Sequence, residues 1–134
     1  MTYLVTKEIT FDSGHRLSKY IGKCYMLHGH TYKLQVTVQS NELDSNGFVI
    51  DFTDLKAVLK TVTDKIDHRT LLYSEDPMNK ELVSNLPDEW FVLVEFEPTV
   101  ENIAKYLYEQ IKKEIPNVVN IRLWETPTSF ADYA

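Results

Sequence analysis

Two of the four histidines of this chain and its only cysteine lie within seven residues, in the stretch CYMLHGH at 24–30. His28 and His30 are two residues apart, so on a strand both imidazoles point to one face. There they could bind one Zn²⁺ at about 2.0–2.1 Å each. A His-x-His pair alone is a weak signal, because two surface or core histidines can share this spacing. The chemistry therefore depends on a third ligand from another segment.

His15 can supply the third ligand. It ends an N-terminal segment in which apolar and mostly polar residues alternate, as in a half-buried strand, and it has the parity of Ile9 and Phe11. His28 and His30 have the parity of the apolar side of a second alternating segment, formed by Tyr32, Leu34, Val36 and Val38. If the two strands pair antiparallel, His15 lies opposite the His28/His30 pair. We therefore predict a three-histidine metal site.

Cys24 is compatible with three roles. As a fourth ligand it would close a His₃Cys tetrahedron, which is typical of structural zinc. Beside an open three-histidine zinc it could act as a base. As an inert buried thiol it would have the commonest fate of a free cysteine. Its position four residues before His28 does not separate these roles.

Two further places in the sequence have titratable groups that could act on or bind a ligand. Asp67 and His68 are adjacent, and a carboxylate that orients an imidazole makes a proton-transfer unit. Such pairs are also common at helix ends, where a histidine favours the dipole. Glu125 ends an apolar segment with the parity of Ile121 and Leu123. It is either a solvated strand-end carboxylate or a group that anchors a ligand, because an unpaired buried charge is costly.

The periodicity of the chain predicts the elements that carry these residues. The order is strand, strand, helix, strand, helix, strand, which indicates an α+β fold with helices on one face of a largely antiparallel sheet. Asn46-Gly47 predicts a tight turn, FVID (48–51) a short strand, and Thr53 and Thr99 the two helix N-caps. The apolar patterns lie at 3–11, 32–38, 55–66, 90–96, 100–111 and 118–125.

Length and composition favour one soluble domain, 1–134, with 43% apolar and 25% charged residues. The net charge of −6 argues against general nucleic-acid binding. Apolar runs are too short to span a membrane, and the N-terminus does not read as a secretory signal. A lone cysteine cannot form an internal disulfide, which fits the cytoplasm.

Taken together, these residues resemble the 6-pyruvoyl-tetrahydropterin synthase superfamily, and most closely its 6-carboxy-tetrahydropterin synthase branch from the queuosine pathway. The resemblance covers nearly the whole chain. It rests on FDSGHRL (11–17), CYMLHGH (24–30), GFVIDFTDLK (47–56), DHRTL (67–71), PTVENIAKYL (98–107) and WETPTSFADY (124–133).

The resemblance implies a role for each of the singled-out positions. The zinc ligands would be His15, His28 and His30, the catalytic groups Cys24, Asp67 and His68, and the pterin-binding residues Thr99, Glu101 and Glu125. It also implies the tunnelling fold, in which a four-stranded antiparallel sheet with two helices on one face joins others in a ring. The usual assembly is a homohexamer of two trimers, with sites at subunit interfaces.

The implied reaction is the zinc-dependent conversion of 7,8-dihydroneopterin triphosphate to 6-carboxy-5,6,7,8-tetrahydropterin, with release of acetaldehyde and triphosphate. The nearest alternative is the pyruvoyl-forming synthase, which eliminates triphosphate without cleaving the side chain. An alternative of another class is a non-enzymatic protein in which a His₃Cys zinc only stabilises the fold. The chain has no Gly-rich dinucleotide fingerprint, which agrees with a reaction that needs no nicotinamide or flavin.

Overall fold

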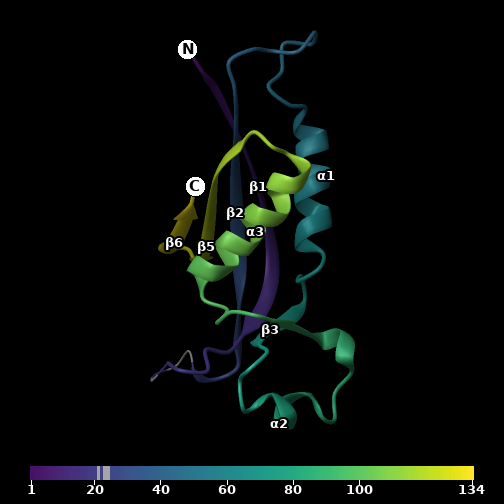
Figure 1. The fold of residues 1–134 in the computed structure, drawn as a ribbon, viewed down its shortest axis with the longest axis vertical. Helices are drawn as coiled ribbons and strands as arrows, with labels where there is room; N and C mark the ends of the chain where they lie inside the picture. Colours follow the sequence, from purple (N-terminus) through teal and green to yellow (C-terminus); the bar gives the residue numbers. More distant parts are fainter. Residues whose placement is uncertain (21, 23–24) are drawn as a thin grey trace.

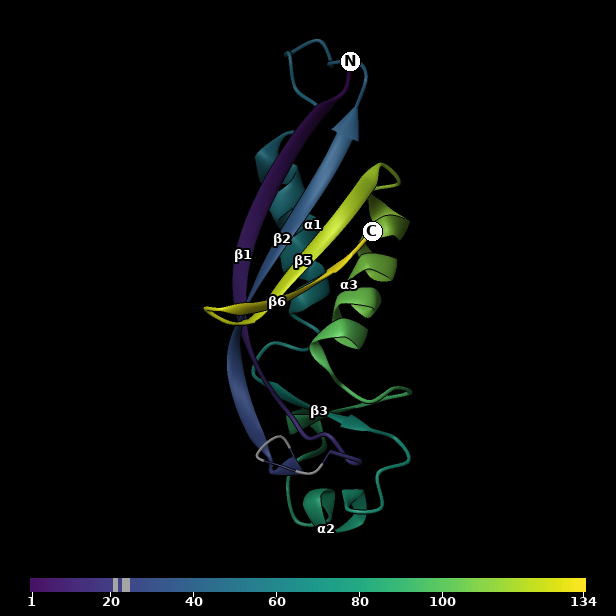
Figure 2. The ribbon, with the colours of Figure 1, turned by 90° about the vertical axis from the view of Figure 1, so that its left-hand side faces the viewer.

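The fold is known from a computed structural model that describes residues 1–20, 22 and 25–134. One mixed sheet of six strands, in the order β4-β3-β1-β2-β5-β6, carries α1 and α3 on one face (Figures 1 and 2). The elements are β1 (Tyr3–His15), β2 (His28–Ser40), α1 (Phe52–Thr63), β3 (Arg69–Tyr73), α2 (Asn79–Val83), a 3₁₀ helix (Asp88–Trp90), β4 (Phe91–Val94), α3 (Val100–Glu114), β5 (Val118–Thr126) and β6 (Ser129–Tyr133). The expected α+β class is confirmed.

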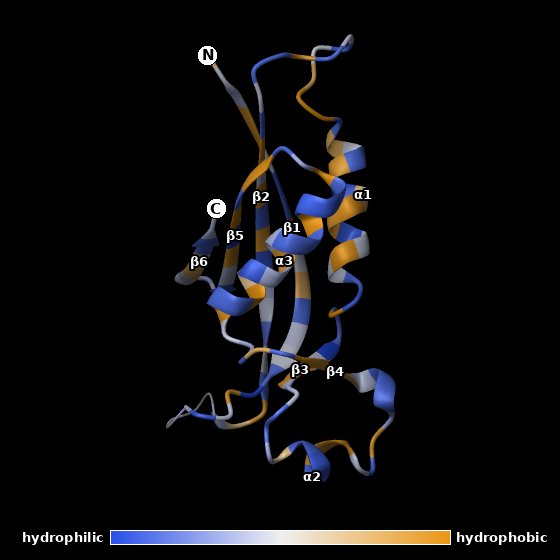
Figure 3. Cartoon of the chain, in the orientation of Figure 1, coloured by the Kyte–Doolittle hydropathy of each residue, from blue (hydrophilic) through white to orange (hydrophobic). Residues whose placement is uncertain are grey.

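Strands β1 and β2 form the centre of the sheet, and their alternation decides which side chains face the helices. In Figure 3 apolar and polar residues alternate in bands along the central strands. The apolar set of β2 is fully buried against α1 and α3, together with Leu55, Leu59 and Leu107. On the outer face polar residues pair across the strands, as Thr6 does with Thr37. Only the inner face is therefore part of the core.

The two long helices begin at residues with a capping side chain. Thr99 caps α3, as predicted, by accepting a hydrogen bond from the backbone N–H of Asn102 at 3.2 Å. The predicted cap of α1 at Thr53 is wrong. Asp51 caps this helix instead, because its carboxylate accepts from the backbone N–H of Thr53 at 2.8 Å. None of the helices in the described part of the chain is long and apolar enough to cross a membrane.

The sheet is larger than predicted. Four predicted strands are present as β1, β2, β4 and β5, but β4 joins the sheet through β3 in a parallel part at the His15 end of β1, and the antiparallel part consists of β1, β2, β5 and β6. The short strands β3 and β6 were not predicted, because five residues give too little alternation to detect. Residues 48–51, predicted as a strand, form none. The Asn46-Gly47 turn is present and is closed locally by a bond from Gly47 N to Asp44 O at 2.9 Å.

Candidate metal centre and active site

The antiparallel register of β1 and β2 brings the three predicted ligands together. His15 pairs with His28 and Ser13 with His30, so all three imidazoles project from the inner face. Their ligand nitrogens lie within 4.8 Å of one another, and the Nε2 atoms of His15 and His28 are 3.0 Å apart. Two nitrogens on a tetrahedral zinc are about 3.3 Å apart, given Zn–N bonds of about 2.0–2.1 Å. The spacing therefore fits one zinc ion.

The other nitrogen of two of these rings is fixed by a backbone carbonyl. The Nδ1–H of His15 donates to Pro98 O at 2.7 Å, and that of His28 donates to Met26 O at 2.7 Å. A carbonyl can only accept, so each bond sets the tautomer that leaves the lone pair on Nε2. The Nε2 atom of His30 is buried and forms no hydrogen bond within the described part of the chain, although the Glu125 carboxylate lies 3.2 Å away. These are the features of metal ligands and their supporting groups.

The environment favours the neutral form of the rings, which is the form that binds metal. Burial lowers the pKa of His15 to about 4, with a hydrogen bond to Pro98 acting against this and the nearby His28 and His30 adding to it. Burial also lowers the pKa of His30, although the Glu125 carboxylate opposes the change. His15 is fully buried. Near neutral pH the His15 imidazole can therefore coordinate a metal ion without first losing a proton.

Glu125, at the end of β5, reaches the same centre. Its Oε1 atom lies 3.2 Å from the Nε2 of His30 and 3.4 Å from the Nε2 of His15. Together with His30 and Trp124 it lines a hollow of about 420 Å³ that also includes the outer-face residues Thr31 and Lys33. The hollow lies where β5 leaves β2 and turns into β6. A ligand in this hollow would lie beside Glu125 and His30, whereas His15 and His28 do not line it.

Asp67 and His68 form the expected hydrogen-bonded pair, with Asp67 Oδ1 2.9 Å from His68 Nδ1. The same oxygen accepts from the backbone N–H of Asp12 at 2.9 Å. Burial acts to raise the pKa of Asp67, but the hydrogen bonds from Asp12 and His68 outweigh it and the pKa is lowered. His68 has a φ of 60°, in the left-handed region, and its side chain is 77% exposed. An exposed imidazole held by a charged carboxylate is suited to proton transfer to a bound molecule.

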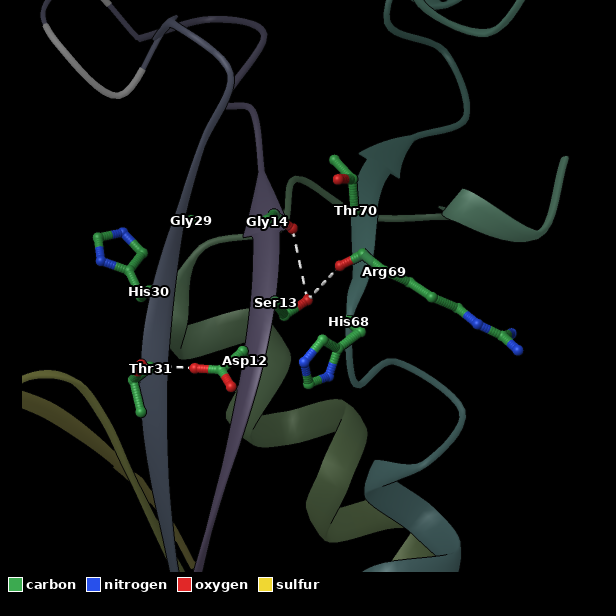
Figure 4. A pocket seen from close by; sticks show the side chains of 9 residues that line it. All are labelled: Asp12, Ser13, Gly14, Gly29, His30, Thr31, His68, Arg69 and Thr70. Carbon is green, nitrogen blue, oxygen red and sulfur yellow. Dashed lines mark hydrogen bonds between the residues drawn. The ribbon is translucent and has the colours of Figure 1, made fainter. Parts of the chain in front are cut away.

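This pair lies on the other face of the sheet from the histidine triad. Its carboxylate and imidazole cluster with Asp12, whose side chain accepts from Thr31 on the outer face at 2.5 Å. Asp12, Thr31 and His68 line a hollow of about 410 Å³. In Figure 4 the other lining residues Gly14 and Gly29 lie further along the same two strands, towards Thr70. The two glycines are register partners and leave this part of the outer face bare. One chain therefore does not bring the predicted Asp–His pair to its own triad.

The other predicted site residues have different outcomes. Cys24 lies outside the described residues, so its role stays a prediction. Thr99 directly follows Pro98, whose carbonyl accepts a hydrogen bond from His15, and Glu101 lies in the first turn of α3. Thr99 uses its hydroxyl as a helix cap, and Glu101 is exposed. Both residues are therefore close in sequence to Pro98, the residue that orients the metal ligand His15.

Sequence reasoning missed the buried ion pair of Arg16 and Asp76. Arg16 follows His15 directly, and both side chains of the pair are at least 95% buried. The Arg16 guanidinium also lies over the ring of Tyr25, 4.4 Å from its centre. The adjacency of Arg16 to a predicted ligand could have drawn attention to it. Nothing in the local pattern pointed to Asp76, which is far away in the sequence.

Comparison with known proteins gives the chain a family. The family described as 6-pyruvoyl tetrahydropterin synthase matches residues 4–134. The chain is 40% identical to the 6-carboxy-5,6,7,8-tetrahydropterin synthase of Haemophilus influenzae, with 98% of each chain covered. It is 34% identical to the protein of the same name from Aquifex aeolicus, with 99% of this chain and 98% of the relative covered.

Solved structures agree with this result. An uncharacterized protein from Wolinella succinogenes has a TM-score of 0.88 at 27% identity, with 99% of this chain and 98% of the other covered. The 6-pyruvoyl tetrahydropterin synthase of Plasmodium falciparum has a TM-score of 0.80 at 25% identity, with 98% of this chain and 96% of the other covered. This chain belongs to the 6-pyruvoyl tetrahydropterin synthase family.

Proposed function

We propose that this chain converts 7,8-dihydroneopterin triphosphate to 6-carboxy-5,6,7,8-tetrahydropterin, with release of acetaldehyde and triphosphate, and that it needs zinc to do so. Its family membership makes it a tetrahydropterin synthase of the lyase type. The observation that carries the zinc dependence is the convergence of three histidine nitrogens, two of them with a carbonyl-fixed tautomer. The pathway would be queuosine biosynthesis, in the cytoplasm.

The residues of the chain divide the work at such a centre. His15, His28 and His30 would hold the zinc, which as a Lewis acid would make the C–H protons of the substrate side chain more acidic. Cys24 as a thiolate would remove one of these protons, because a nearby cation lowers the pKa of a thiol. His68, oriented by Asp67, would move the other. Glu125 would accept two N–H donors of the pterin ring.

The position of Asp67 and His68 supports an assembled active site. The pair lies on the outer face of the sheet and the triad on the inner face, so the pair of one subunit would serve the metal centre of another. We propose a homohexamer of two trimers in which sheets join edge to edge and place sites at subunit interfaces. Light scattering at micromolar concentration should give the hexamer mass, and a monomer would leave the shared site without support.

Two other functions remain to be separated from this one. A pyruvoyl-forming synthase would use the same residues, but the relatives at 40% and 34% identity are both named as 6-carboxy-tetrahydropterin synthases. In a non-enzymatic protein the zinc would be structural, with Cys24 as a fourth ligand. The exposed Asp67–His68 pair favours an enzyme, since a structural zinc site would not need it.

Removal of the metal tests the proposal. The protein is treated with a chelator, its fold is followed by circular dichroism, and triphosphate release from 7,8-dihydroneopterin triphosphate is measured before and after zinc is returned. An open catalytic site should lose zinc and turnover but keep its fold, and should regain turnover with zinc. Unfolding on chelation would indicate a structural zinc. Full turnover by the metal-free protein would rule out zinc dependence.

A further inference from the structure

The orientation of His15 depends on a carbonyl that must itself be held. His15 is fully buried, and its Nδ1–H donates to Pro98 O at 2.7 Å. Pro98 lies in the turn Glu97–Thr99, which connects β4 to α3. If this turn shifted, the Nε2 atom of His15 would no longer point at the other two ligands. The groups that fix the turn therefore also fix a metal ligand.

Asn102 holds this turn at two points. Its side-chain Nδ2–H donates to Glu97 O at 3.0 Å, and its backbone N–H donates to Thr99 Oγ1 at 3.2 Å. Glu97 O accepts a second bond, from the backbone N–H of Thr99 at 2.8 Å. The residues that follow, Ile103 and Ala104, are fully buried, so this end of α3 is fixed in the core. Asn102 thus ties the turn to a rigid element.

A second contact joins the turn to the segment that follows β1. The Glu97 carboxylate accepts from the backbone N–H of Ser18 at 2.9 Å and also from the Ser18 hydroxyl. The end of β1 and the segment after it therefore contact the turn at two residues, Pro98 through His15 and Glu97 through Ser18. From the side of α3, the Asn102 amide holds the turn through Glu97 O, and its side chain has no other role in the proposed site.

We propose that Asn102 is a positioning residue of the metal centre, which holds the Glu97–Thr99 turn so that Pro98 O fixes His15 for zinc. The inference rests on the proposed zinc site and adds a residue that touches neither metal nor substrate. Partners of this kind typically contribute about 10–100-fold in metal affinity. Asn102 acts one step further out, so we expect an effect near the lower end of that range.

Asn102→Asp is the informative change. Aspartate has nearly the same shape but cannot donate to Glu97 O. A carboxylate in the first turn of a helix is favoured by the helix dipole, so α3 should not be weakened. Its negative charge would also attract a nearby cation, which acts against the expected loss. A drop in zinc affinity would therefore report the loss of the donor to Glu97 O, which the carboxylate oxygen replaces with a second acceptor, and neither helix instability nor a lost attraction for the cation.

The matched control is Asn117→Asp. The Nδ2–H of Asn117 also donates to a backbone carbonyl, that of Gln39 at 2.8 Å, but at the far end of β2 from the histidines. The zinc dissociation constant is measured for all three proteins by competition with a chromogenic chelator. We expect Asn102→Asp to bind zinc about 10-fold more weakly and Asn117→Asp to bind like the wild type. Unchanged affinity in Asn102→Asp, or an equal loss in both variants, would overturn the proposal.

A second measurement needs no metal and separates this inference from the proposed function. In the metal-free protein, nitrogen-15 NMR of the histidine rings gives the tautomer of His15 and the exchange rate of its Nδ1–H with solvent. Asn102→Asp should speed this exchange and leave that of His28 unchanged, since His28 is bonded to Met26 O. An unchanged rate would refute the positioning role, even if the wild-type protein bound no zinc and the metal centre itself were wrong.

Discussion

The ion pair between Arg16 and Asp76 should carry much of the stability of the active-site end. Asp76→Asn removes the charge with little change of shape, and the asparagine oxygen can still accept from the backbone N–H of Met78, as Asp76 does at 2.9 Å. It leaves the Arg16 guanidinium, 5% exposed, without a counter-charge. Breaking one side of a buried pair typically costs about 3–5 kcal/mol. A domain has only about 5–15 kcal/mol of stability in total.

A second ion pair of the same chain is the matched control. Arg122 and Asp132 form a bidentate pair at 2.8 and 3.0 Å, but their side chains are 37% and 39% exposed. Exposed pairs are typically worth about 0.2–1 kcal/mol, so Asp132→Asn should change the free energy of unfolding little. Urea unfolding of both variants at equal protein concentration measures the difference. A loss in Asp76→Asn no larger than that in Asp132→Asn would refute the reasoning from burial.

Four further outcomes follow from the site. His28→Ala should lose zinc and turnover, whereas Cys24→Ala should keep zinc and lose about 10²–10⁴-fold in rate; zinc loss in Cys24→Ala, measured by metal analysis, would make the thiol a ligand. Glu125→Gln should weaken pterin binding by about one to two powers of ten, because an unpaired buried donor costs about 1–3 kcal/mol, while zinc content stays full; zinc loss would place the carboxylate at the metal. In the metal-free protein, the pKa of His15 falls from 6.5 to about 4 on folding, so the unfolded chain takes up the proton first as the pH falls. The free energy of unfolding should therefore be unaffected by His15 protonation above pH 6.5 and be lower by about 3 kcal/mol at pH 4. Urea unfolding at the two pH values should show a smaller decrease for His15→Gln, which has no group to protonate at this position.

The histidine triad could be predicted because it depends on local alternation and on the pairing of two neighbouring strands. The parity of His15 with Phe11, and of His28 and His30 with Tyr32, was enough to place the three rings on one face. The Glu125 carboxylate followed the same rule in β5. These features depend on the two-residue period of a strand, which the sequence shows directly.

The position of Asp67 and His68 could not be predicted in the same way. It depends on the parallel pairing of β1 with β3, a strand of five residues that gives almost no periodic signal. The contact of Asp67 with the backbone of Asp12 spans 55 residues, and local patterns carry no information on such a contact. The N-cap of α1 was misplaced for a smaller reason. Asp51 and Thr53 are both good caps, and the sequence does not show which one begins the helix.

The most direct test of the proposed function is the identity of the product. The zinc-loaded protein is incubated with 7,8-dihydroneopterin triphosphate, the pterin product is identified by mass spectrometry, and acetaldehyde is measured in the same sample. We predict 6-carboxy-5,6,7,8-tetrahydropterin together with equal amounts of acetaldehyde and triphosphate. A pyruvoyl tetrahydropterin without acetaldehyde, or recovery of unchanged substrate, would contradict the proposed function.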